Sequence, residues 1–255
     1  GYVFLASAYL FVLYKTATRG ALIGLVVGVV TTVLLLVYFG SGKIRKFSAV
    51  TLGALFLALL LFVSARNLDF VKNSQTLNRF TQINFESITK EPRLMVWGMA
   101  LKGFKENPVL GWGQDNFNLV FNKYYNPGMY AQEPWFDRAH DVFFDWLTAG
   151  GLFGLLAYLS LFGVAIYVVW KRSELLKFTL IDKAIFTGMF VAYFVQNIFV
   201  FDNLMSYTMF FTLLAYLHHG SRTLQAPHQP HHKVVGNQSD ELFFTQVVSS
   251  IVLVG

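Results

Sequence analysis

The side chains best suited to chemistry lie in residues 65–146, the one long polar stretch of an otherwise apolar chain. Arg93 carries a guanidinium fork, which can bind the paired oxygens of a phosphate. Trp97 follows one helical turn later and offers an aromatic face on which a sugar ring can stack. His140 carries an imidazole, the usual general base near neutral pH, which can take a proton from an incoming hydroxyl group. Together these three side chains predict a site for an anionic, sugar-like substrate.

Arg19 is a further candidate anion ligand, because it opens an apolar segment in the sequence Thr-Arg-Gly-Ala. The free N–H groups at a helix start bind phosphate, and an arginine beside them would add to that binding. Each candidate also has a structural explanation. Arg19 can extend toward lipid headgroups. Arg93 and Trp97 can belong to an interfacial helix with a tryptophan anchor, and His140 can be a hydrogen-bonded structural residue.

The remaining polar residues are weaker candidates. Asp137, Asp141 and Asp145 recur every four residues, which predicts an acidic stripe on one face of a helix. Such a stripe could hold a divalent cation, but no complementary ligands accompany it, which favours a solvated face or an arginine partner. Most histidines lie in residues 218–240, a proline-containing stretch where composition alone explains them. The chain has no cysteine, which excludes disulfides and cysteine-based metal sites.

The composition is that of a membrane protein. The chain is 55% hydrophobic and 13% charged, whereas soluble domains carry about 25% charged residues. The net charge of +6 is an orientation signal in such a chain and, without basic runs interleaved with aromatics, no sign of nucleic-acid binding. We therefore predict an all-α polytopic membrane protein. The apolar segments lie near residues 1–14, 20–40, 49–64, 147–170, 184–201 and 203–217, with another beginning near 241.

These segments divide the chain into five predicted parts. The short connections at 41–48 and 171–183 are basic, which favours the cytoplasmic side and puts the long polar stretch outside. The last part begins a further helix, as expected for a fragment of a longer protein. The parts are transmembrane helices at 1–64, an external loop at 65–146, transmembrane helices at 147–217, a cytoplasmic linker at 218–240 and the start of another transmembrane helix at 241–255.

Two local patterns predict how the transmembrane helices meet. Only Asp202 divides the last two apolar segments, which favours a tight helical hairpin over one long broken helix. Polar residues near this point would be signs of function inside a membrane, although a helix break explains them as well. Gly24 and Gly28 form a small-xxx-small pattern typical of packed membrane helices. The polar residues near the division at Asp202 are Gln196, Asn197, Asp202 and Asn203.

The external loop should contain two helices. The first is expected to begin at Pro92 and to end at Asn107-Pro108, followed by a turn at Gly111 and Gly113. The second is expected to begin near Asp137 and to run straight into the apolar segment at 147. His140 would then lie about two turns before the bilayer core.

The chain resembles the O-antigen ligase/polymerase superfamily of bacterial envelope glycosyltransferases over roughly residues 16–165. Each motif is short, and their order along the chain makes the match specific. Members often have His-Asn where this chain has His-Asp, so the sequence departs from the pattern at Asp141. The motifs are Thr-Arg19-Gly-Ala, Arg93-xxx-Trp97, Pro108-xx-Gly111-x-Gly113, His140-Asp141 followed by Leu147, and Gly150-Gly-Leu-Phe-Gly154.

The resemblance implies a GT-C-like helical bundle in the bacterial inner membrane, with the large loop on the periplasmic side. It implies transfer or polymerisation of glycan from an undecaprenyl-diphosphate-linked donor onto a glycan, lipid or protein acceptor, without metal or other cofactor. Arg19 and Arg93 would bind the diphosphate, and His140 would act on the acceptor hydroxyl group. A direct displacement would invert the anomeric centre. The further expected substrate-binding residues are Trp97, Asp141, Trp112 and Gly113.

Several functions remain open at this stage. Within the superfamily, polymerase, ligase and protein O-oligosaccharyltransferase differ only in acceptor. A transporter or channel for a small anion would line its path with Arg19. Transporter helices are commonly broken by Gly or Pro near mid-membrane, however, and no proline interrupts an apolar segment here. A non-catalytic envelope protein that only binds glycan would keep its function without His140.

Overall fold

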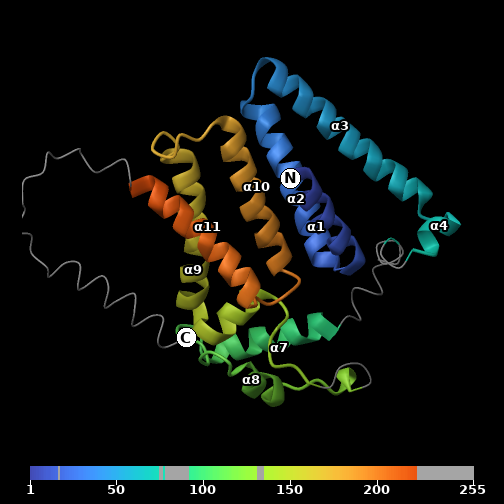
Figure 1. Cartoon of the computed structure of the whole chain (residues 1–255). Helices are drawn as coiled ribbons and strands as arrows, with labels where there is room; N and C mark the ends of the chain where they lie inside the picture. Colours follow the sequence, from blue (N-terminus) through green and yellow to red (C-terminus); the bar gives the residue numbers. More distant parts are fainter. Residues whose placement is uncertain (17, 75–76, 78–91, 131–134, 223–255) are drawn as a thin grey trace, which may run out of the picture.

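The computed structural model describes residues 1–16, 18–74, 77, 92–130 and 135–222, and every regular element in these ranges is a helix (Figure 1). The all-α prediction is therefore confirmed for this part of the chain. Most of the expected linker and all of the final apolar segment lie outside the described residues. The elements are α1 (Tyr2–Thr16), α2 (Arg19–Phe39), α3 (Gly42–Ala65), α4 (Asp69–Lys72), α7 (Pro92–Glu106), α8 (Phe117–Lys123), the short 3-10 helix η1 (Pro127–Met129), α9 (Val142–Lys171), α10 (Leu180–Asn197) and α11 (Leu204–Arg222).

In the described part of the chain, three helices, α2, α3 and α9, are long and apolar enough to cross a membrane, and α1 is apolar but shorter. Among the described helices, α10 and α11 do not combine length and apolarity to the same degree, although both were expected to span. Helix α3 gains its length by starting at Gly42, well before the apolar run at 49–64. The basic residues expected in a loop after α2 therefore lie within the first five residues of α3.

Helices α2 and α10 form the most extensive helix pair of the described chain. They approach through small residues, as the pattern of Gly24 and Gly28 predicts. A Cβ added at Gly28 would lie only 2.5 Å from the carbonyl oxygen of Gly188 on α10. The pair is antiparallel, because Gly20 at the start of α2 lies against Phe199 just beyond the end of α10. The backbones thus touch directly, which fixes the height of one helix against the other.

Helices α10 and α11 are two separate helices, as the hairpin prediction requires, but six residues divide them and not Asp202 alone. Residues 198–203, hereafter the link, join them, and their aromatic side chains then pack against each other. The rings of Phe186 and Tyr216 lie parallel with centroids 5.9 Å apart, and Phe210 packs against Phe190 at 6.1 Å. Helix α9 completes this aromatic core with Phe162, 4.9 Å from Phe210.

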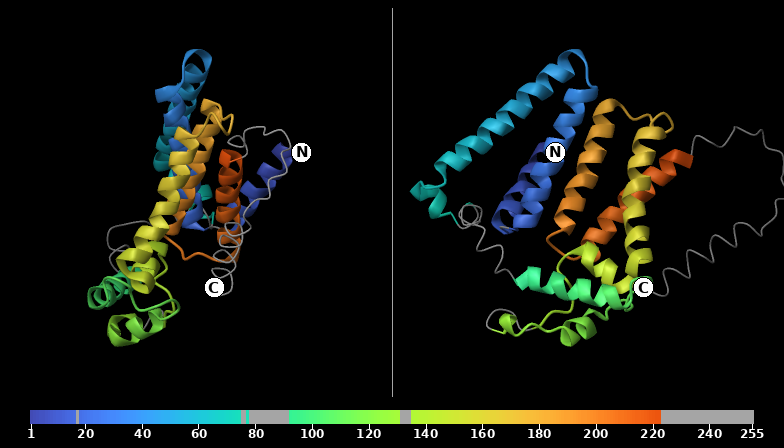
Figure 2. Two further views of the ribbon diagram at one scale, coloured as in Figure 1. Left: turned by 90° about the vertical axis from the view of Figure 1, so that its left-hand side faces the viewer. Right: turned by 180° about the vertical axis from the view of Figure 1, so that it is seen from behind.

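Helices α7 and α8 form a layer at one end of the bundle, and α7 runs across the direction of the long helices (Figure 1, Figure 2). The sequence predicted α7 from Pro92 to Asn107, which is confirmed. It did not predict α8, whose apolar residues have helical spacing over only seven residues. The buried core of this layer consists of Val96, Met99, Ala100, Phe117, Phe121, Met129, Phe136 and Ala139.

Helix α9 is broken at Gly151, which has φ 61° and ψ −155°. The turn Pro108–Gly113 fills the break with four backbone hydrogen bonds, so the groups freed by the break keep their partners. We call this unit, Pro108–Gly113 with Thr148–Phe153, the joint. Its bonds run from the N–H groups of Trp112 and Gly113 to the carbonyls of Thr148 and Ala149 (2.8 and 2.9 Å), and from those of Leu152 and Phe153 to the carbonyls of Pro108 and Val109 (2.8 and 3.4 Å).

The expected straight helix from Asp137 is therefore wrong in two respects. The helix begins only at Val142, and it bends at Gly151. The physical reason for the bend is the inserted turn, which replaces helical hydrogen bonds by bonds across the joint. The glycines of both motifs permit this approach. A Cβ at Gly111 would lie 2.4 Å from the carbonyl oxygen of Thr148, and one at Gly151 would lie 2.4 Å from that of Val109.

We expect Gly151→Ala to lower the free energy of unfolding. The backbone at Gly151, with φ 61° and ψ −155°, lies in a region that is essentially restricted to glycine and costs a residue with a Cβ about 1–3 kcal/mol, and the contact with Val109 adds to this cost. The measurement is thermal unfolding of the purified protein in detergent, followed by tryptophan fluorescence.

Gly163→Ala is the matched control, because Gly163 lies on the same helix and a Cβ there meets nothing within 4 Å. This variant should be as stable as the wild type or slightly more so, since alanine is the better helix former. Equal stability of the two variants would show that the joint tolerates a side chain at Gly151.

Candidate active site

His140 is held in an uncommon conformation directly before α9. Its φ is 57°, in the left-handed region that residues with a Cβ rarely adopt. The imidazole packs edge-on between Phe136 and Phe201, with ring centroids 5.1 and 5.0 Å away. Phe136 belongs to the core of the α7–α8 layer and Phe201 to the link, so two separate parts of the fold fix the ring. A strained residue maintained by its surroundings is a common feature of functional sites.

The hydrogen bond of His140 determines which ring nitrogen is available for chemistry. Nδ1 lies 3.2 Å from the carbonyl oxygen of Arg138. A carbonyl can only accept, so Nδ1 carries the hydrogen in this contact and the neutral ring has its lone pair on Nε2. The arrangement leaves Nε2 as the atom that can take a proton, which is what a general base requires.

Trp97 contacts the backbone beside His140 and lies on the same helix as Arg93. Its indole Nε1 donates to the carbonyl oxygen of Ala139 at 3.2 Å, and its ring stacks on Phe144 with centroids 5.4 Å apart. Arg93 lies one turn earlier on α7 and therefore on the same face of that helix. Because Phe144 covers one face of the indole, a sugar stacked on Trp97 would have to use the other face.

Asp141 forms the N-cap of α9. Its Oδ1 accepts the N–H groups of Phe143 and Phe144 at 2.8 and 3.1 Å, and its side chain is buried. Burial raises the pKa of Asp141 from its ordinary value of 3.8 to about 6, although the two backbone hydrogen bonds act in the opposite direction. The cap needs only an acceptor oxygen, which an asparagine also supplies.

The predicted acidic stripe does not exist, because α9 begins only at Val142. Asp137 precedes the helix and is exposed, and Asp141 is its cap. Asp145 lies in the first turn and accepts the N–H group of Ala139 at 2.6 Å, which fixes the backbone beside His140. Within the described residues, no group of three acidic or histidine side chains is arranged to hold a metal ion.

The link is anchored by the buried carboxylate of Asp202. It accepts hydrogen bonds from Tyr158 of α9 at 3.1 Å, from Ser206 of α11 at 2.9 Å and from Tyr193 of α10. Three helices thus hold one carboxylate, which satisfies a buried polar group that would otherwise be costly. Asp202, together with Asn197 and Asn203, therefore stabilises the break between the two helices and the link that carries Phe201 to the imidazole.

The link also contacts the start of α2, directly beside Arg19. A Cβ added at Gly20 would lie 2.7 Å from the Cβ of Phe199, two residues before the phenylalanine that packs on His140. Arg19 is the first residue of α2, as predicted, and is exposed. His140 is therefore in contact with the link, and Arg19 is next to a residue that contacts it. Both lie at the same end of the bundle.

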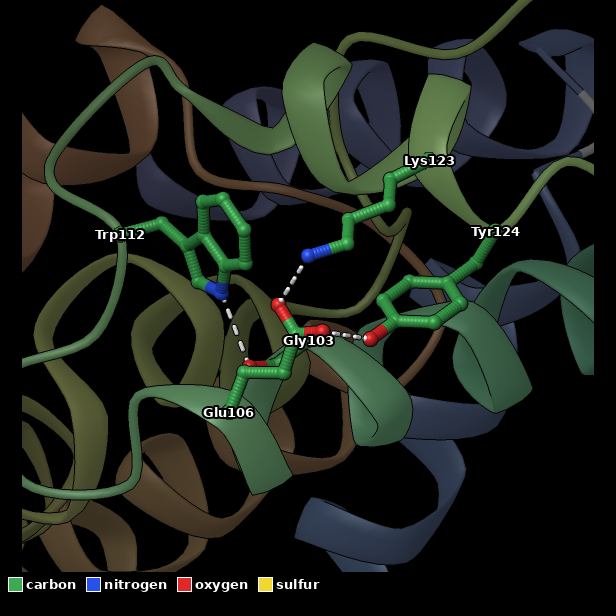
Figure 3. Close-up of polar contacts among 5 residues, drawn as sticks. All are labelled: Gly103, Glu106, Trp112, Lys123 and Tyr124. Atoms are coloured by element: carbon green, nitrogen blue, oxygen red, sulfur yellow. Dashed lines mark hydrogen bonds and ion pairs between the residues drawn. The ribbon is translucent and has the colours of Figure 1, made fainter.

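Trp112 and Gly113 make contacts inside the protein. The N–H group of Gly113 belongs to the joint, and the indole Nε1 of Trp112 donates to the carbonyl oxygen of Gly103 at 2.8 Å (Figure 3). The ammonium group of Lys123 lies over the Trp112 ring, 5.3 Å from its centroid. These contacts tie the joint to α7 and α8, and a contact of either residue with substrate stays a prediction.

Glu106 joins the ends of α7 and α8 in the same cluster (Figure 3). Its carboxylate accepts hydrogen bonds from Lys123 Nζ at 2.8 Å and from the hydroxyl group of Tyr124. These bonds lower the pKa of Glu106 below its ordinary value. The cluster is exposed, so we assign it an orienting role and little stability.

Sequence reasoning missed the two rings that hold His140. Phe201 is far from His140 in sequence and reaches it only through tertiary folding, and Phe136, four residues before His140, carries no pattern that distinguishes it from other aromatic residues of the loop. The cap at Asp141 did carry a signal, since an aspartate directly before an apolar helical run is typical of an N-cap. The four-residue spacing of the aspartates concealed it.

The described residues form a helical membrane protein with histidine and arginine residues at one end of its bundle. A family model described as O-antigen ligase matches residues 3–159, which include Arg19, Arg93 and His140. The chain belongs to the O-antigen ligase family. The resemblance seen in the sequence is thus confirmed, and the family is one of membrane enzymes of glycan transfer. No curated protein matches the chain.

We expect Asp141→Asn to remove one component of the pH dependence of stability. The pKa of Asp141 is raised in the folded protein, so its contribution to the free energy of unfolding is fully present below its ordinary pKa and is lost as the pH rises through about 6. Asparagine keeps the cap and does not titrate. The thermal unfolding midpoint of the wild type should therefore fall relative to that of Asp141→Asn between pH 4 and pH 7.

A second variant, Asp141→Ala, distinguishes the effect of the titrating charge on stability from the effect of the helix cap. It lacks the acceptor oxygen and should lose about 1 kcal/mol relative to Asp141→Asn at every pH. A wild type and an Asp141→Asn variant with the same pH profile would contradict the raised pKa, and an alanine variant as stable as the asparagine variant would contradict the cap.

Proposed function

We propose that the chain transfers or polymerises glycan from an undecaprenyl-diphosphate-linked donor onto an acceptor hydroxyl group, with Arg19 and Arg93 binding the diphosphate and His140 as the base. The proposal places the protein in the bacterial inner membrane as a GT-C-like bundle. Residues 65–146, with α7 and α8, would lie on the periplasmic side.

An apolar groove that ends near Arg19 carries the lipid-linked donor. It has a volume of about 570 Å³ and lies between α1, α2, α10 and α11. Its lining is mainly apolar, with Ala21 and Leu25 from α2 and Met189 from α10. Such a groove fits part of a polyprenyl chain. Because Ala21 is two residues from Arg19, a chain lying in the groove would bring its diphosphate to the start of α2.

The two arginines and the helix start suit the leaving group. In the proposed step the acceptor oxygen attacks the anomeric carbon, and the bond from that carbon to the diphosphate oxygen breaks with its electron pair. Negative charge therefore develops on the diphosphate, where guanidinium groups and backbone N–H groups stabilise it. Arg19 opens α2 and Arg93 is the second residue of α7. Direct displacement inverts the anomeric centre.

The geometry of His140 suits the proton transfer. The acceptor hydroxyl group loses its proton as its oxygen attacks, and Nε2 of His140 is the proposed destination. The bond from Nδ1 to the carbonyl oxygen of Arg138 and the flanking rings Phe136 and Phe201 support this role, because they orient the imidazole before substrate arrives.

We expect His140→Ala to slow the release of free undecaprenyl diphosphate by about 10²–10⁴-fold, the usual contribution of a general base. The assay uses the full-length protein in proteoliposomes with an undecaprenyl-diphosphate-linked oligosaccharide and an acceptor. A ladder of longer lipid-linked glycans would identify a polymerase, and sugar found only on the added acceptor would identify a ligase or a protein O-oligosaccharyltransferase.

His218→Ala is the matched control, because His218 is an exposed histidine near the opposite end of α11. It should retain wild-type turnover. If His140→Ala turns over the donor as fast as the wild type, the base is another group. If no protein turns over any donor, the transporter and the glycan-binding protein become the better interpretations.

We expect Arg93→Lys to impair turnover nearly as much as Arg93→Ala, because an ammonium group cannot replace a bidentate fork on phosphate oxygens. Steady-state kinetics in the same proteoliposomes measure this effect. Lys105→Ala, an exposed cation in the last turn of α7, serves as the control and should be unchanged. Wild-type kinetics for the lysine variant would exclude paired hydrogen bonds from Arg93 to the diphosphate.

A further inference from the structure

The joint exposes a cluster of large apolar side chains. Val109 and Leu110 of the turn are 54% and 74% exposed. Leu152 and Phe153, the residues of α9 whose N–H groups bond to the turn, are 49% and 65% exposed. We call these four residues the apolar tip. Single exposed apolar residues are ordinary on a protein surface, whereas a contiguous group calls for a partner.

The length of α9 places the apolar tip relative to a bilayer. The part of the helix after the break, Gly151–Lys171, is about 30 Å long at its rise of about 1.5 Å per residue, which is roughly the thickness of the hydrocarbon core. Lys171 and Arg172 mark the polar end of that part. The break at Gly151 therefore lies at the opposite edge of the core, and the turn bonded to it lies at the same level.

The helix surface next to the apolar tip is also exposed and apolar, as expected of a surface that faces lipid. Leu156, one turn further along α9, is 52% exposed on a helix that is itself long and apolar enough to cross the membrane. The apolar tip thus continues the surface that α9 presents to lipid. The turn cannot withdraw from this position without breaking the four hydrogen bonds of the joint.

We propose that the apolar tip is a membrane contact, in which Val109 and Leu110 enter the edge of the bilayer beside α9 and touch lipid chains. The turn follows α7 directly. Its insertion would hold the end of α7, and with it the α7–α8 layer, at the membrane surface. The inference concerns lipid alone and is independent of the proposed reaction.

Fluorescence quenching tests the contact. The sequence has no cysteine, so a thiol introduced by Leu110→Cys can carry a single environment-sensitive fluorophore in the full chain reconstituted in phosphatidylcholine–phosphatidylglycerol vesicles. We expect spin-labelled lipid to quench this label and aqueous iodide to leave it largely unchanged. Leu156→Cys is the lipid-exposed reference. Leu119→Cys on α8, 51% exposed, is the water-exposed reference and should show the reverse pattern.

Two results would overturn the proposal. A label at Leu110 that iodide quenches as strongly as the label at Leu119 would place the apolar tip in water. A label that neither iodide nor spin-labelled lipid quenches would mean that protein covers it. Recovery of folded protein is checked by comparing the thermal unfolding of the labelled variants with that of the wild type, and Val109→Cys repeats the test at the neighbouring residue if Leu110→Cys does not fold.

Discussion

The joint is the constraint on which the arrangement of the site depends. A helix that is interrupted where it is buried must find partners for the backbone groups it frees, because unpaired buried polar groups are costly. Here the turn Pro108–Gly113 supplies both donors and acceptors to the break at Gly151. The α7–α8 layer is thus attached to α9 through backbone bonds, whose geometry depends little on which side chains surround them.

The candidate base depends on this attachment together with a second one. The joint and Trp97 position the segment that ends in His140, and the link positions Phe201 on the other side of the imidazole. The link is in turn held by Asp202 and by the contact of its Phe199 with the start of α2. Two rings from different stretches of sequence, Phe136 and Phe201, therefore pack on the imidazole, and Trp97 from a third stretch holds the backbone beside it.

The sequence predicted what depends on composition and local periodicity. The helix from Pro92, the division of the last apolar stretch into two helices and the packing of Gly24 and Gly28 all follow from such patterns and are confirmed. The break in α9 was not predicted, since Gly150-Gly151 inside an apolar run is also compatible with a straight helix. The acidic stripe was wrong because spacing alone cannot tell a cap from a helix interior. For the site, the sequence supplied candidate residues, whereas the surroundings of His140 required the tertiary structure.

The contact of α2 with α10 has a consequence for membranes of different thickness. Helices adapt to a thinner or thicker bilayer by tilting, and two helices joined by side chains can slide as they tilt. At Gly28 and Gly188 the backbones themselves are in contact, so the pair has to tilt as a single body. Arg19, at the start of α2, and the link, at the end of α10, would then move together, and their spacing should be insensitive to the lipid in which the protein is embedded.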